Sequence, residues 1–389
     1  MLNKILFLGA MSFLCGTVAY SSESALLKQI EQNNKEIQIA KANMVGENAQ
    51  AKSENNLPDP EIELESMVAP ETSWEFSLSE QVEWPGVYAS RHKAIKHLMS
   101  AQQFLYESTI VNIRKQVRFA LCDIIDINRQ VNLLEQMYKM LNTVLTRATK
   151  DELRSEFTIV EITKFKLKAL TIAETLRNLR IRKQNLISSL VTLNGGNPIT
   201  GVDFGQLSYS IDIQSLSYYV DAYKKGPDYK VRQQETLAAK YDLSATKRSY
   251  FPNLKLGYKF SKNDIESGHT VVFGISIPVF SNRHKVVATK AAHTAAILNA
   301  DKDEFEARQR IRVLYDELMS LDKAISDYES VLNHEDLKSY LDMAFEKNAI
   351  TALRYLDEYE FLAEAKEKLN VMKYEFANKY IELSKYNIY

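Results

Sequence analysis

Apolar and polar residues alternate strictly in two parts of this chain. The alternating stretches are 61–65 and 74–79 in the first part, and 254–260 and 271–277 in the second. A period of two residues is that of a β-strand whose two faces meet different surroundings. The pattern therefore predicts two β-hairpins, at 60–83 and 253–280, each with one apolar face.

After each hairpin the apolar period lengthens to about 3.5 residues, which is the period of a coiled coil. The heptad positions include Val117, Ile124, Val131, Tyr138 and Leu145 after the first hairpin, and Ile311, Leu318 and Ile325 after the second. The 389 residues contain only 12 glycines and 8 prolines, which favours long helices with few turns. We therefore expect long helical hairpins at 86–194 and 283–387.

The whole pattern occurs twice. The matching segments are 57–58 with 251–252, 91–93 with 283–285, and 155–158 with 348–351, separated by 194, 192 and 193 residues. A near-constant separation across unlike segments indicates a duplicated structural unit. We expect a first repeat at 22–194, a connecting segment at 195–226 and a second repeat at 227–389.

The first 21 residues have the features of a secretory signal peptide. Lys4 gives a positively charged start, and a short apolar run follows it. This run is too short to cross a membrane as a helix. Whether Cys15, within the same segment, carries a lipid stays open. Cys122 stands alone in a helical pattern, and we expect a small buried core residue there rather than a redox thiol.

Composition and motifs argue against several classes of function. The formal net charge is −1, which gives no argument for nucleic acid binding. No nucleophile elbow, phosphate-binding loop or paired-carboxylate arrangement is present, and the six histidines include no pair at i, i+4 spacing. We therefore expect neither an enzyme nor a bound cofactor or metal.

The order of elements, with two local motifs, resembles the TolC-type outer-membrane efflux channels over essentially the whole mature chain. Trp84-Pro85-Gly86, followed by Arg91 and Ala94, is similar to the strand-to-helix junction of the metal-cation branch of that family. The segment 345–358 resembles the second helical turn region of the family. The resemblance therefore concerns the order of the elements, the strand-to-helix junction and the second helical turn region.

The helical turns also depart from the family pattern. Thr351 and Leu356-Asp357 match it, but Asn348 stands where the family usually has glycine, and Ser155 takes the glycine position of the first turn. Asparagine tolerates a left-handed backbone, so the replacement at 348 is mild. Serine, at position 155, tolerates a left-handed backbone less well.

The resemblance implies a mainly α protein with a small β part. Three copies would each give four strands to a shared twelve-stranded outer-membrane barrel, and their helices would form a periplasmic α-barrel. The implied partners are a periplasmic adaptor protein and, through it, an inner-membrane pump of the RND type. Four strands alone leave edges that lipid cannot satisfy, which independently argues for closure by other subunits.

The strand pattern suggests which residues would line such a barrel. If the apolar positions face lipid, their charged neighbours face the lumen; these are Glu61, Glu63, Glu65, Glu75, Lys255 and Lys259. Four carboxylates against two ammonium groups favour cations. The alternative is that any water-filled barrel needs polar residues and the sign of the charge is incidental.

The helical turns are where a tunnel could close. The residues considered for the periplasmic end and its gate are Ser155, Asn348, Arg354 and Asp357. The resemblance puts Asp357 at the position of a gate aspartate, but Arg354 and Ile350 do not reproduce the charged latch of the family. The alternative for Asp357 is a solvated carboxylate near a helix start. Thr158 and Glu161 form a capping-box pattern that explains both residues without a further role.

These observations favour the passive exit channel of a tripartite efflux system. Two alternatives are a periplasmic adaptor and a structural coiled coil of the envelope. An adaptor would need glycine-rich β-domains around one helical hairpin, and a structural coiled coil would need no amphipathic strands. The sequence does not identify the transported substrate or the pump.

Overall fold

A computed structural model describes residues 23–68, 73–149, 157–208, 211–263, 265–332 and 337–387. The predicted signal peptide with Cys15, and Ser155 in the first helical turn, lie outside the described residues. The chain divides into two compact units. One unit contains 39–109 and 223–308, and the other contains the segments up to 38, 110–222 and from 309 onward.

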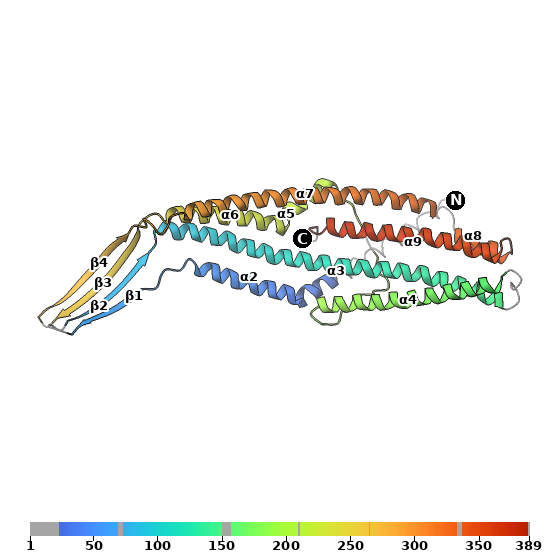
Figure 1. The fold of residues 1–389 in the computed structure, drawn as a ribbon, viewed down its shortest axis with the longest axis horizontal. Helices are drawn as coiled ribbons and strands as arrows, with labels where there is room; N and C mark the ends of the chain where they lie inside the picture. Colours follow the sequence, from blue (N-terminus) through green and yellow to red (C-terminus); the bar gives the residue numbers. More distant parts are fainter. Residues whose placement is uncertain are drawn as a thin grey trace, which may run out of the picture. The chain divides into compact units, whose positions relative to one another are not determined.

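The strands belong to the unit of 39–109 and 223–308. They are β1 (Glu61–Met67), β2 (Ser73–Val82), β3 (Asn253–Asn263) and β4 (Ser267–Ser276). All four form one antiparallel sheet in the order β1-β2-β3-β4, so the hairpins of the two repeats join edge to edge through β2 and β3 (Figure 1). The alternation predicted the hairpins, but not that they share one sheet.

Helical segments complete this unit. They come from α2 (Lys35–Ser53), α3 (Pro85–Thr149), α6 (Pro227–Arg248) and α7 (Lys285–Leu332). Polar contacts connect α6 to both neighbours: His97 Nδ1 on α3 lies 2.8 Å from Gln234 Oε1, and Arg232 Nε donates to Asp303 Oδ2 on α7 at 2.6 Å. The His97 ring also stacks on Tyr241, with ring centroids 5.4 Å apart.

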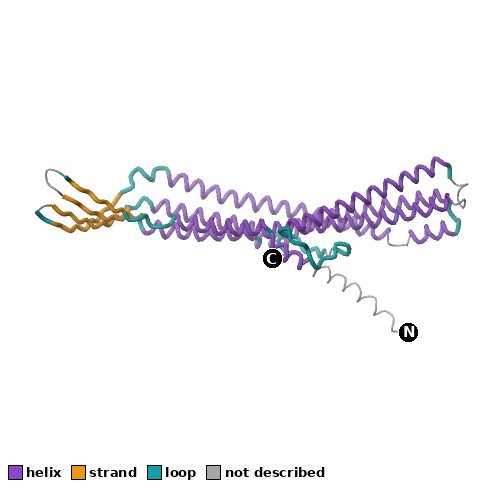
Figure 2. Tube along the Cα trace, turned by 90° about the horizontal axis from the view of Figure 1, so that it is seen from below, coloured by secondary structure: helices purple, strands orange, loops and turns teal. Residues whose placement is uncertain are grey.

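The second unit is all helical apart from its connections. Besides parts of α3 and α7 it holds a helix at 23–33, α4 (Ile159–Leu193), most of α5 (Leu216–Lys225), α8 (Leu337–Glu346) and α9 (Ala352–Leu383), drawn in purple in Figure 2. The heptad positions form its core: Val117, Ile124 and Leu318 are completely buried. Cys122 is also completely buried, against Ala377 and Ile381, as predicted for a core residue.

A polar junction at Asn34 separates the helix at 23–33 from α2. Asn34 caps α2, since its Oδ1 accepts from the Ile37 amide at 3.0 Å, and its Nδ2 donates to the Leu193 carbonyl at 2.8 Å. At the end of α4, Gly195 has a φ of +67°, and a Cβ there would lie 2.3 Å from the Asn33 carbonyl oxygen. Only glycine fits this close approach.

Candidate functional site

The register of the sheet separates apolar from charged side chains. Directly paired residues of neighbouring strands point to the same side, so each row of pairs belongs to one face. One row is Leu64, Phe76, Phe260 and His269; the next row is Glu63, Ser77, Lys259 and Thr270. Rows of these two kinds alternate along the sheet, but two charged residues stand in the apolar rows: Glu80 opposite Leu256, and Lys262 opposite Trp74. We call the two sides the apolar face and the charged face.

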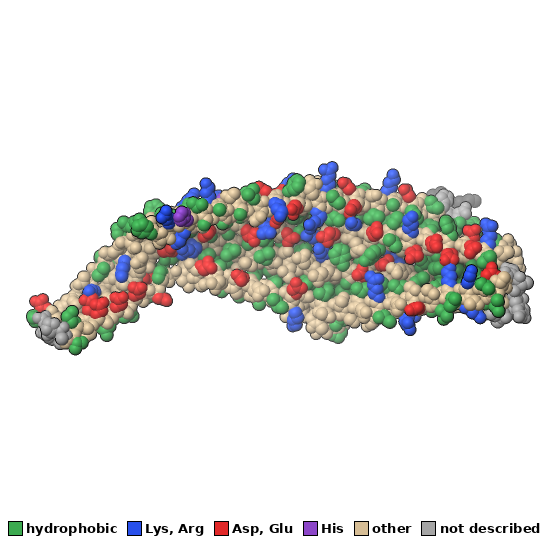
Figure 3. Space-filling model, in the orientation of Figure 1, with side chains coloured by type: hydrophobic (Ala, Val, Ile, Leu, Met, Phe, Trp, Pro, Cys, Tyr) green, Lys and Arg blue, Asp and Glu red, His purple; other side chains and the backbone are tan. Residues whose placement is uncertain are grey.

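The charged face collects all six of the predicted lumen residues, from three strands. These are Glu61, Glu63 and Glu65 on β1, Glu75 on β2, and Lys255 and Lys259 on β3. Figure 3 shows a group of acidic side chains over the strands. Lys259 forms an ion pair with Glu75, and Ser77 Oγ donates to Glu63 Oε2 at 3.4 Å. Carboxylates therefore outnumber ammonium groups on this face, and one of the two ammonium groups is already paired.

None of the described residues covers the apolar face. Large exposed fractions are found on β1, β3 and β4: Leu64 is 71% exposed, Leu256 57% and Phe273 81%. The sequence-predicted apolar set lies together on this face: Ile62, Leu64, Trp74, Phe76, Leu254, Leu256, Tyr258 and Phe260. A continuous apolar surface of this kind marks a site of contact with lipid or protein.

Aromatic residues, among them tryptophan and tyrosine with their polar groups, lie near both ends of the strands, which the alternation alone did not reveal. Near the β-turns, the Trp74 and Phe260 rings are 5.2 Å apart, and Tyr258 Oη lies 2.5 Å from His269 Nδ1. At the helical end, Trp84 stacks on Phe251 with centroids 5.6 Å apart. Amphipathic aromatic rings of this type favour an interface between an apolar and an aqueous phase.

The second helical turn contains Asn348 in a specific backbone role. Its φ of 53° lies in the left-handed region. The Ala349 amide donates to the Ala344 carbonyl at 2.8 Å, and the Asn348 amide donates to Phe345 at 3.1 Å. These two bonds form a Schellman motif, which ends α8 and usually has glycine at the left-handed position. Asparagine can fill it because its short side chain tolerates this backbone.

Behind this turn, aromatic packing connects three helices. The Phe345 and Tyr355 rings stack with centroids 4.4 Å apart and planes 7° from parallel. The Arg147 guanidinium at the end of α3 lies 5.2 Å from the Phe345 ring centre, a cation–π contact. Tyr355 Oη donates to Asp342 Oδ1 at 2.6 Å. Burial and this bond raise the pKa of Tyr355, so its hydroxyl stays protonated and keeps donating.

The remaining residues considered for this end lie on the surface. Arg354 is exposed and pairs with Glu358 on its own helix, Nη2 to Oε1 at 3.3 Å. Asp357 is exposed near the start of α9. The capping box at Thr158 and Glu161 is present, with the Thr158 amide donating to Glu161 Oε2 at 2.7 Å. These hydrogen bonds lower the pKa of Glu161.

The described part of the chain shows no arrangement for metal chemistry. No group of three or more His, Cys, Asp or Glu side chains in it could hold a metal ion. Within the same residues, no helix is long and apolar enough to cross a membrane. The features that remain are the two-faced sheet and the helical turns.

No protein-family model and no curated protein sequence matches this chain. Solved structures do match its fold. CusC, whose structures concern folding and transmembrane channel formation, is 15% identical, with 94% of this chain and 92% of that chain covered and a TM-score of 0.76. The outer-membrane channel OprN is 11% identical, with 94% and 89% covered and a TM-score of 0.77.

The outer-membrane channel CmeC of Campylobacter jejuni is similar to the same extent. It is 13% identical, with 94% of this chain and 85% of that chain covered and a TM-score of 0.74. At identities this low, the similarity shows a shared fold. The fold is that of proteins described as outer-membrane channels.

Proposed function

We propose that this protein is the outer-membrane exit channel of a tripartite efflux system and that it works as a homotrimer. The observation that carries the proposal is the register of the sheet, which puts most of the large apolar side chains on one exposed face and the six predicted lumen residues on the other. A membrane barrel needs this arrangement, with lipid outside and water inside. The shared fold with outer-membrane channels supports it.

The open edges of the sheet support assembly from several copies. Among the described strands, β1 and β4 each have one edge without a strand partner. In lipid, the backbone groups of such an edge must be hydrogen-bonded, so a closed barrel is required. Three copies of the four-stranded sheet give a barrel of twelve strands. The aromatic residues at both ends of the strands suit the two surfaces of the bilayer.

In this proposal the channel conducts passively and its partners supply the energy. A periplasmic adaptor contacts the helical turns and links them to an inner-membrane pump of the RND type. Cations, including metal ions, are the proposed substrate class, because carboxylates outnumber ammonium groups on the charged face. Salt weakens this preference in a wide pore, so the preference is expected to be modest.

The helical turns at Asn348 and near Ser155 are the proposed closing point. Asp357 is exposed close to the second turn, and three symmetry-related copies could bind cations there. Arg354 is paired along its own helix with Glu358, so it does not serve as a latch in this arrangement. Asp357→Ala should raise the resting conductance in a bilayer recording and weaken block by divalent cations from the periplasmic side. Unchanged conductance and unchanged block would leave Asp357 as a helix-end carboxylate.

The oligomeric mass of the extracted protein tests the proposal as a whole. A trimer that needs detergent supports the channel. A stable monomer in water without detergent would favour the alternatives, a periplasmic adaptor or a structural coiled coil. The exposed apolar face argues against both alternatives, because neither a periplasmic adaptor nor a structural coiled coil requires an exposed apolar sheet face.

A further inference from the structure

A short loop connects β4 to α7 at the helical end of the sheet. Ile277 continues the apolar alternation of β4, and Val279 and Phe280 follow it with exposed fractions of 66% and 84%. Figure 3 shows hydrophobic side chains beside Lys or Arg and a His where the strands meet the helices. We call residues 277–285, which include the first residue of α7, the junction loop.

Hydrogen bonds fix the backbone of the junction loop. Asn282 is buried, its Nδ2 donates to the Ser249 carbonyl at 2.5 Å, and Tyr250 Oη donates to the Asn282 carbonyl at 2.5 Å. The Arg283 amide donates to the Phe280 carbonyl at 3.2 Å. The folded backbone therefore presents Phe280 to the outside while the residue two positions later is held inside.

The charge next to these apolar side chains is positive. Arg283, His284 and Lys285 end the junction loop, and the stretch 267–300 contains no Asp or Glu. All three residues are exposed. Lys285 Nζ donates to Asn282 Oδ1 at 3.0 Å, but this partner is neutral and leaves the charge in place.

The first repeat contains the same triplet at 91–93, in different surroundings. Arg91 Nη2 pairs with Glu83 Oε2 at 2.8 Å, and Lys93 Nζ lies 5.7 Å from the centre of the Tyr241 ring. Within the described residues, by contrast, no ion pair involves any member of the triplet 283–285. The cations of the second copy are therefore available to a partner outside the chain.

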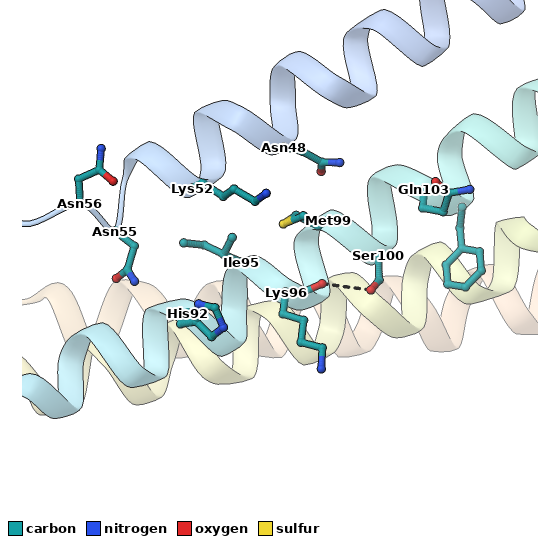
Figure 4. A pocket seen from close by; sticks show the side chains of 11 residues that line it. Asn48, Lys52, Asn55, Asn56, His92, Ile95, Lys96, Met99, Ser100 and Gln103 are labelled. Carbon is teal, nitrogen blue, oxygen red and sulfur yellow. Dashed lines mark hydrogen bonds between the residues drawn. The ribbon is translucent and has the colours of Figure 1, made fainter.

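Other basic side chains of the same unit lack a neighbouring exposed apolar loop. Lys52, His92 and Lys96 line a groove between α2 and α3, and Figure 4 shows them pointing in different directions. The combination of exposed apolar and basic side chains thus distinguishes the junction loop. Lys96 is exposed and provides a matched position for a control change of charge.

Exposed apolar side chains followed by cations suit a membrane surface that carries negative headgroups. We propose that the junction loop binds anionic phospholipid, with Val279 and Phe280 among the acyl chains and Arg283 at a headgroup phosphate. A soluble anion would leave Phe280 in water, and a zwitterionic lipid would gain little from the charge. The inference rests on the proposed membrane sheet, because the loop must lie at one bilayer surface, and it adds the class of lipid bound there.

Native mass spectrometry of the full-length protein in detergent tests the lipid class. The probes are phosphatidylglycerol and phosphatidylcholine in equal amounts. We expect phosphatidylglycerol to bind at least about fivefold more tightly, since each cation near a negative surface favours binding by about this factor. The preference should shrink as the ammonium acetate concentration rises, because salt screens the charges. Equal binding of both lipids would overturn the proposal.

A matched pair of variants tests the position. Arg283→Glu reverses the charge in the junction loop, and Lys96→Glu makes the same change at an exposed position of the same unit. Arg283→Glu should weaken phosphatidylglycerol binding at least about tenfold, while Lys96→Glu should bind like the wild type. Equal weakening by the two variants would overturn the proposal. Thermal melting of each variant checks that folding is retained.

Phe280→Ser tests the apolar part and should weaken binding of both lipids. Unchanged lipid binding by this variant would also overturn the proposal, and a simultaneous loss of trimers would identify a second copy as the occupant. Counting bound lipids does not require a particular assembly, so the two proposals can fail separately. A trimer that binds both lipids equally would keep the channel and remove the lipid site, whereas a stable monomer in water would contradict the channel.

Discussion

The sheet and the coiled-coil helices use the same apolar residue types in opposite ways. Leu64 and Phe273 on the sheet are 71% and 81% exposed, whereas Leu318 and Ile124 on the helices are completely buried. Both regions have a regular apolar period, so the period alone does not tell them apart. Helices of one chain can cover one another's apolar stripes. In the part of the chain that the structure describes, nothing covers the apolar face of the four-stranded sheet.

This difference concerns where stability and function come from. The apolar side chains of the helical core are buried against other helices of the same chain, so the hydrophobic effect stabilises this core directly. The apolar face of the sheet gains free energy only from an outside partner, which we propose to be lipid. Core changes should therefore act on unfolding, and changes on the apolar face should act on membrane insertion.

The largest effect is expected in the helical core, where Leu318→Ala removes a completely buried side chain. Loss of buried methyl groups and the cavity left behind should cost about 2–5 kcal/mol per chain. Thermal unfolding followed by circular dichroism should show a clearly lower midpoint. Asp316→Ala, at an exposed position on the same helix, should change stability by less than about 0.5 kcal/mol. Equal midpoints for the two variants would contradict the assigned core.

Leu256→Arg tests the opposite side of the comparison. It puts a charge on the apolar face, and near the bilayer midplane this should cost about 2–4 kcal/mol per chain and block insertion. Lys255→Ala changes the adjacent residue, which lies on the charged face, and should insert normally. Membrane fractionation after expression measures both variants. Equal damage from both would mean that the faces are assigned to the wrong surroundings.

A smaller effect on stability is expected at Asn348, where a substitution changes the backbone conformation and not the packing of the core. Alanine at a φ of 53° should cost about 1–2 kcal/mol, while Asn348→Gly should be neutral or stabilising. Thermal melting of the two variants compares them directly. If alanine melts like glycine, the left-handed turn does not persist in the protein. Gly195 has the same position at the end of α4, but there a close carbonyl excludes any side chain.

The smallest effect is expected from the charged face. Changing Glu61, Glu63 and Glu65 together to Gln removes three carboxylates from each chain without altering the apolar face. The cation-to-anion permeability ratio in a bilayer recording should fall, and it should fall more at low salt, where screening is weaker. Assembly and melting should stay close to wild type. A ratio that does not respond at any salt concentration would remove the charge argument for cation preference.

Much of the fold could be read from local patterns. The strict alternation predicted hairpins at 60–83 and 253–280, and the strands lie at Glu61–Met67, Ser73–Val82, Asn253–Asn263 and Ser267–Ser276. Heptads predicted the buried positions Val117 and Leu318, because a 3.5-residue period keeps one stripe facing a neighbouring helix. The capping box at Thr158 was likewise local, since its partner Glu161 is only three residues away.

These local patterns did not predict the contacts between segments that are far apart in the sequence. Nothing in the sequence pairs Ser77 with Lys259, or brings Asn34 to the end of α4. The stack of Phe345 on Tyr355 beneath Arg147 also joins residues whose separation carries no periodic signal.

The sequence by itself determined which residues are strand or helix, which side of each strand is apolar, and that the unit is duplicated, because these depend on short-range period and on internal repetition. Only the tertiary structure decided that the two hairpins join through β2 and β3 into one sheet, and which polar groups meet between helices. Strand pairing and helix packing depend on surfaces far apart in the chain, and many pairings satisfy the same local pattern.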